Sequence, residues 1–144
     1  MTPTEYASAF AVALRDQEAT VGKRVAVDPR SAHQPGTPDT LRLAHDLIDA
    51  LRARPEVARV CVPEQPGPDL APYCDPHDGK STVRYAVSFS TPLAIARDTV
   101  EFSASFVRLE TTAFSPAFAF GLHYRVARNK TSWVVVERRD TFIT

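Results

Sequence analysis

The chain has 144 residues and a mass of 15.9 kDa, which is the size of one domain that buries about 70% of its unfolded surface. Seventeen Lys and Arg residues balance seventeen Asp and Glu residues, which argues against a protein that binds nucleic acid through its overall charge. Hydrophobic residues at 44% and charged residues at 24% exclude a disordered chain.

The first apolar stretch, residues 6–14, is too short to span a membrane and follows no basic segment, so we expect no membrane insertion. Thr2, Pro3 and Glu5 have the pattern of a capping box, which predicts that a helix begins there. Apolar residues then recur every four positions, and Gly22 is a natural end for this helix.

The alternating segment 24–28 predicts a short strand, and the polar segment 31–37 predicts a loop. Thr37 and Pro38 repeat the cap-plus-proline signal, and Pro55 must end the second helix. Its predicted buried stripe consists of Leu41, Ala44, Ile48 and Leu51.

Residues 57–62 predict another strand, and the Pro-rich segment at about 63–82 predicts a long loop. The first half has too few strands to fold alone, so residues 1–144 are expected to form a single domain.

From residue 83 onward the apolar period is two, which indicates strands at 83–90, 100–106 and 118–126. Asn129 and Lys130 predict a tight hairpin turn with a positive φ at the asparagine. The continuous apolar run 133–136 favours a central or doubly covered strand.

These elements predict an α+β domain in which two N-terminal helices pack on a curved antiparallel sheet of about four long strands, with one or two short extra strands. The aromatic residues of the second half are expected to line one face of this sheet, against which both helices dock. Tyr85, Phe102, Phe120 and Trp133 are its markers.

The segment 120–128, followed by a hairpin and by Trp133 and three valines, resembles the last two strands of NTF2-like and cystatin-like domains. In those families a curved sheet clasps helices, so the resemblance implies the same arrangement here. The Cys-flanked loop ahead of the sheet also resembles uncharacterised bacterial secreted proteins.

The two cysteines, Cys61 and Cys74, flank a Pro-rich stretch that gains from a covalent tie, which predicts a disulfide. A bonded pair implies an extracytoplasmic location, and reduced thiols imply a cytoplasmic one. Zinc held by Cys61, Cys74 and His77 is the alternative, but the spacing is only half a site, so we assign no metal.

Polar residues on the strands of the second half could converge into a ligand-binding pocket. The candidates are Ser88, Glu101, Ser103, His123 and Arg125, accompanied by Ser90 and Ser105. A solvent-facing sheet would have the same composition, so both interpretations stay open.

The chain contains no Gly-x-Ser-x-Gly elbow and no phosphate-binding Gly-rich loop, which argues against a nucleophilic enzyme and against a nucleotide cofactor. We therefore expect a non-enzymatic binding or interaction domain without a cofactor, whose partner is a protein or a small molecule. The alternative is a small NTF2-like enzyme or binder with a cone-shaped pocket of His123, Glu101 and Arg125. A homodimer is compatible with either function.

Overall fold

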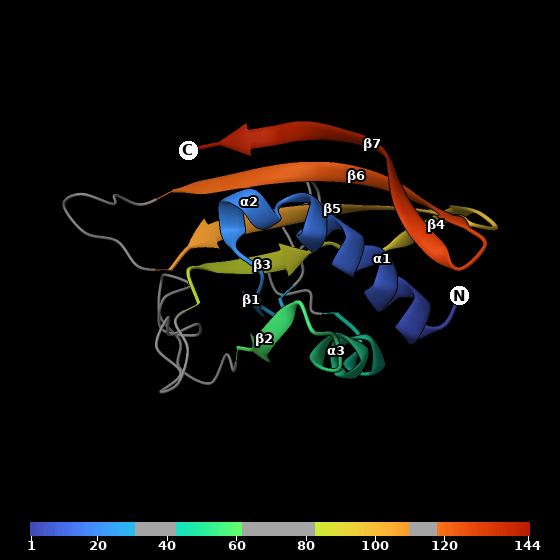
Figure 1. Cartoon of the computed structure of the whole chain (residues 1–144), viewed down its shortest axis with the longest axis horizontal. Coiled ribbons are helices and arrows are strands. Elements are labelled where there is room, and N and C mark those ends of the chain that lie inside the picture. Colours follow the sequence, from blue (N-terminus) through green and yellow to red (C-terminus); the bar gives the residue numbers. More distant parts are fainter. Residues whose placement is uncertain (31–42, 62–82, 110–117) are drawn as a thin grey trace.

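Figure 1 shows the fold as a computed structural model that describes residues 1–30, 43–61, 83–109 and 118–144. These ranges contain the helices α1 (Pro3–Asp16), α2 (Glu18–Val21) and α3 (His45–Arg52) together with a seven-stranded mixed sheet. The predicted α+β class is confirmed. The expected loops at 31–37 and 63–82 lie wholly outside the described residues.

The start of α1 follows the capping box that the sequence predicts. The Thr2 hydroxyl accepts a hydrogen bond from the Glu5 backbone N–H, and the Glu5 carboxylate accepts one from the Thr2 N–H, both at 3.2 Å. Pro3 occupies the first helical turn, where its missing N–H costs nothing. After the short α2, Gly22 ends the helical segment with a φ of 95°.

The second predicted helix is shorter than the sequence suggests, because α3 begins at His45 rather than near Pro38. Ala44 has extended backbone, and the Leu43 N–H donates to the Pro29 carbonyl, so neither residue belongs to a helix. Ile48 and Leu51 are buried as expected, whereas Ala44 is exposed and Leu41 lies outside the described residues. The helix ends before Pro55, as predicted.

The strands occur in the spatial order β2-β1-β3-β5-β6-β7, with β4 paired to β5 (Figure 1). The longer strands β3, β5, β6 and β7 pair antiparallel, as expected, whereas the short β1 is parallel to both of its neighbours, so the sheet is mixed. The bounds are β1 Val25–Val27, β2 Val57–Val60, β3 Tyr85–Phe89, β4 Leu93–Ala96, β5 Thr99–Arg108, β6 Ala119–Asn129 and β7 Ser132–Ile143.

One face of the sheet, which we call the inner face, is covered by the helices. α1 contacts β5, β6 and β7, while α3 contacts α1 and β2. Phe10 of α1 stacks on Phe89 with ring centroids 4.1 Å apart and meets Phe102 edge-on at 4.7 Å. The marker aromatics of the sheet belong to the same apolar cluster, Trp133 at its margin, so the prediction of one shared core is confirmed.

The opposite face, which we call the outer face, has a buried apolar cluster at the β1–β3 end. A small cluster there contains Ala26, Cys61, Val83, Ala86 and Leu109. The two faces of β1 and β3 are therefore both buried, which explains why β1 carries no polar residue. Cys61 is buried in this cluster, directly after β2, and Cys74 lies outside the described residues, so their pairing stays a prediction.

The hairpin between β6 and β7 differs from the expected turn by one residue. Asn129 pairs with Ser132, which leaves Lys130 and Thr131 as the turn, and the positive φ of 61° belongs to Lys130. Asn129 ends the strand instead of forming the turn.

Among the described residues β7 pairs only with β6 and therefore lies at the edge of the sheet, which corrects the prediction that residues 133–136 form a central strand. The side chains of Val134 and Val136 are 47% and 57% exposed. Burial still alternates over residues 133–136, so the run is continuous because the exposed positions carry valine and not because both faces are covered. The register with β6 shifts between Arg125 and Val126, so that Val136 is an extra residue in β7. Val135, opposite Val126, still packs against the core.

Ionic contacts fix α1 to the sheet at both of its ends. Asp16 at the C-terminal end accepts a 2.8 Å hydrogen bond from the buried Tyr124 hydroxyl and an ion pair from Arg138. At the N-terminal end, Arg128 binds Glu5 and Asp98, and its guanidinium lies 5.5 Å from the centre of the Trp133 ring. These contacts hold the helix at a set position across β5, β6 and β7.

Candidate functional site

Polar side chains form two rows across the outer face, because every second residue of an antiparallel strand points to that side. In one row Ser103 of β5 lies opposite His123 of β6, which lies opposite Arg139 of β7. In the other row Glu101 lies opposite Arg125, which lies opposite Glu137.

Glu101 and Arg125 form the strongest ion pair of this face. Both Nε and one terminal nitrogen of Arg125 donate to the same carboxylate oxygen, at 2.9 and 2.7 Å. The hydrogen bond from Arg125 lowers the pKa of Glu101 below its usual range, so this carboxyl stays ionised at neutral pH. The pair is therefore neutral as a unit, and Glu137 lies 3.7 Å from the same guanidinium.

His123 stands between two partners. Its Nδ1 is 3.1 Å from the Ser103 hydroxyl, and its Nε2 is 3.8 Å from a Glu101 oxygen. The backbone N–H of Ser103 donates to the hydroxyl of the buried Ser90 at 2.8 Å. The ring is thus oriented by β5 on both sides, while a quarter of its side chain stays open to solvent.

These residues line an open groove of about 840 Å³ on the outer face. Glu101, Ser103, Ser105 and His123 form its polar part, whereas Arg125 and Ser88 of the predicted set do not line it. The remaining lining residues come from the β3–β4 connection, β4, β5 and β7: Ser90, Thr91, Pro92, Leu93, Phe102, Arg139, Thr141 and Phe142.

An exposed phenyl ring forms one side of this groove. Phe142 of β7 lies over Gly121 of β6, so closely that a Cβ at Gly121 would come within 2.3 Å of the ring. The missing side chain of Gly121 lets the ring lie flat against the sheet beside Ser105, which is paired with Gly121. The Phe142 side chain remains 40% exposed, so it can contact a bound molecule.

The contribution of β7 to the groove does not follow from the residue pattern. Thr141 and Phe142 follow a second register shift, between Gly121 and Leu122, which breaks the alternation that pattern analysis relies on. Gly121, which lies on the same face of β6 as Ala119 and His123, is the available signal, since a glycine inside a strand often marks a close approach.

The Ser103, His123 and Glu101 side chains can hydrogen-bond a ligand and pass a proton to or from it. They are poorly suited to nucleophilic catalysis. Ser103 lies within hydrogen-bond distance of an imidazole, as a nucleophile requires. Its own N–H, however, is taken up by Ser90, so that donor cannot stabilise an oxyanion. The described residues contain no group of three or more His, Cys, Asp or Glu that could hold a metal ion.

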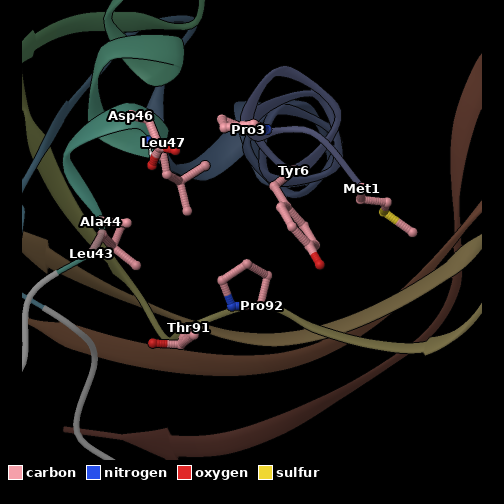
Figure 2. A pocket seen from close by; sticks show the side chains of 9 residues that line it. All are labelled: Met1, Pro3, Tyr6, Leu43, Ala44, Asp46, Leu47, Thr91 and Pro92. Atoms are coloured by element: carbon pink, nitrogen blue, oxygen red, sulfur yellow. Dashed lines mark hydrogen bonds between the residues drawn. The ribbon is translucent and has the colours of Figure 1, made fainter.

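A second, smaller cavity of about 270 Å³ lies on the helix side, between the start of α1, the start of α3 and the β3–β4 connection. Figure 2 shows Tyr6 between Met1 and Pro92, with Leu43 and Leu47 on the α3 side. Its side chains are mostly apolar, and it shares Thr91 and Pro92 with the outer groove. It lacks the paired polar groups of the groove.

In comparisons with known proteins, no family model, no curated protein and no solved structure matches this chain. Within the described ranges, no helix has the length and apolar character needed to cross a membrane. The function is therefore argued from the geometry of the site alone.

Proposed function

We propose that this protein is a non-enzymatic binding domain whose outer-face groove takes a small, neutral, polyhydroxylated molecule such as a sugar. The observation that carries the proposal is the groove itself, in which hydroxyl and imidazole groups from neighbouring strands stand beside an exposed phenyl ring. Sites of this kind combine an apolar surface with a few placed polar groups.

The hydrogen-bonding capacity of the groove fits hydroxyl groups. Ser103, Ser105 and Thr141 each carry a hydroxyl that both donates and accepts, and His123 adds a ring nitrogen. The exposed ring of Phe142 offers a flat apolar surface for the C–H face of a sugar ring.

The charge balance favours a neutral ligand. The carboxylate of Glu101 is neutralised by Arg125. The two rows together carry two carboxylates, Glu101 and Glu137, and two guanidinium groups, Arg125 and Arg139, so their formal charges cancel. The rigid ion pair instead helps to orient His123 toward the groove.

The test is a panel of monosaccharides and disaccharides, screened by thermal shift and confirmed by calorimetry. We expect at least one sugar to raise the Tm in a concentration-dependent manner, because a ligand that binds only the folded state stabilises it. S105Y fills the groove next to Gly121 and should abolish this shift.

The matched control is T99Y, which places the same side chain on the outer face of the same strand but outside the groove lining. It should retain the full shift, and circular dichroism should show both variants folded. A wild-type protein that binds no sugar of the panel, or an S105Y variant that binds like the wild type, would contradict the proposal.

One observation favours the alternative, a small NTF2-like enzyme. The chain of contacts from Ser103 through His123 to Glu101 could move a proton to or from a bound substrate. Arg125 would then act as a positioning residue for Glu101, since it does not line the groove. Chemical conversion of a bound sugar, lost in His123→Gln, would favour this alternative over simple binding.

We also propose the family likeness, the location and the disulfide that the sequence predicts. The likeness of the last two strands to NTF2-like and cystatin-like domains is supported by the way α1 crosses β5, β6 and β7. An extracytoplasmic location and the Cys61–Cys74 disulfide remain linked predictions, because the bond needs an oxidising compartment.

A further inference from the structure

The long edge strand β7 is the most prominent unpaired element of the fold. It has twelve residues, and among the described residues it pairs only with β6 (Figure 1). Four of the seven exposed large hydrophobic residues in the described ranges lie on it: Val134, Val136, Phe142 and Ile143. A long edge with apolar side chains is a template for pairing with another strand.

The pairing with β6 fixes which side of the sheet each β7 residue faces. Val134, Glu137, Arg139 and Phe142 lie opposite outward-facing residues of β6 and therefore face outward. Trp133, Arg138 and Ile143 lie opposite inward-facing residues and therefore face inward.

Two antiparallel copies of β7 related by a twofold axis must place outward residues opposite outward residues. This condition admits a register centred on Arg138. In that register Glu137 of each copy lies opposite Arg139 of the other, so two pairs of opposite charge form. Val134 then faces Phe142 of the other copy, and Trp133 faces Ile143.

The neighbouring allowed register, centred on Arg139, is less favourable. It places Arg138 opposite Asp140 of the other copy, but Arg138 is already paired with Asp16 of its own chain, and the Glu137–Arg139 pairs are lost. It also brings the two Arg139 side chains together, and like charges directly opposite each other destabilise a strand pair. In the register centred on Arg138 the two Arg138 residues also meet, but each already has a carboxylate partner in Asp16 of its own chain.

We propose that a second copy of this chain docks antiparallel on β7, in the register centred on Arg138, and joins the two sheets edge to edge. Charges on an edge strand ordinarily discourage such pairing, but here the sequence Glu137, Arg138, Arg139 is complementary to itself. Edge pairing extends the sheet sideways and leaves its outer face open. Arg139 and Phe142 contribute both to this pairing and to the groove lining, so the dimer is tested without ligand.

The test is light scattering coupled to gel filtration over a concentration series. The wild type should reach twice the chain mass of 15.9 kDa. E137R and R139E each replace two attractive pairs by two repulsive ones, so each should raise the dimer dissociation constant roughly tenfold or more. An equal mixture of the two variants should dimerise again, because in the mixed dimer both contacts between residues 137 and 139 join opposite charges.

Folding is not at risk in these variants, since the Glu137 side chain is 55% exposed and Arg139 is exposed. E18R, an equal charge change on the exposed Glu18 of α2, is the matched control and should dimerise like the wild type. A wild type that stays monomeric at its highest soluble concentration would overturn the proposal. A dimer that ignores both charge changes, or that mixing does not restore, would overturn it equally.

Discussion

Asp16 joins α1 to two strands of the sheet, β6 and β7. It ends α1, accepts the hydrogen bond of Tyr124 from β6 and pairs with Arg138 of β7. Burial alone would raise the pKa of Asp16, but the hydrogen bonds from Arg138 and Tyr124 outweigh it and lower this pKa below 3.8. Burial and the nearby carboxylate raise the pKa of Tyr124, so its hydroxyl stays protonated and keeps donating.

Asp16→Asn should therefore lower the free energy of unfolding at pH 7 by about 2 kcal/mol, the contribution of hydrogen bonds to a charged group. The stabilisation from the depressed pKa of Asp16 is complete above 3.8 and is lost as the pH falls through the lower folded-state value. Urea unfolding of both proteins between pH 7 and pH 2 should show the difference shrinking with acid. Asp49→Asn, an exposed site on α3, is the control, and an Asp16→Asn difference that is constant with pH would contradict the account.

The sequence patterns that correctly predict the helices and strands are local ones. The capping box of α1 involves residues within one turn, so the sequence alone placed the helix start correctly. The start of α3 was misplaced because the Leu43 N–H bonds to the distant Pro29 carbonyl, a contact that no local pattern reveals. β4 was missed because Leu93–Ala96 is short and exposed throughout, without alternation.

The bulges of β7 had a larger effect, because each adds a residue and reverses the alternation of the residues that follow. This explains why Phe142 was not assigned to the site. The run Val134 to Val136 suggests a central strand for another reason, since its two exposed positions carry valine. The polar row of Ser103 and His123 could be predicted, since buried and partly exposed residues alternate regularly around Ser103 in β5 and around His123 in β6.

The capping box provides a direct test of how α1 is held. Thr2→Ala removes the acceptor for the Glu5 N–H and should lower the free energy of unfolding by about 1 kcal/mol. Thr2→Ser keeps the hydroxyl and should lose much less. Denaturant unfolding at one pH measures both, and equal stability of Thr2→Ala and wild type would show that the cap contributes nothing to the fold.

For the whole molecule, the sheet separates two tasks. Its inner face carries the aromatic core with Phe10, Phe89 and Phe102, and α1 and α3 cover it. Its outer face carries the polar groove along β5, β6 and β7. The parallel pairing of β1 was beyond sequence analysis, because parallel strands meet through long connections that leave no local pattern.

We propose the outer face of the sheet, and not the cavity between the helices, as the binding surface of this protein. The most direct measurement is a two-dimensional amide NMR titration with the sugar that gives the largest thermal shift. The account predicts that the changed resonances gather at Ser103, Ser105, His123 and Phe142. Changes gathered at Tyr6, Leu43 and Leu47, the residues of the helix-side cavity, would contradict it.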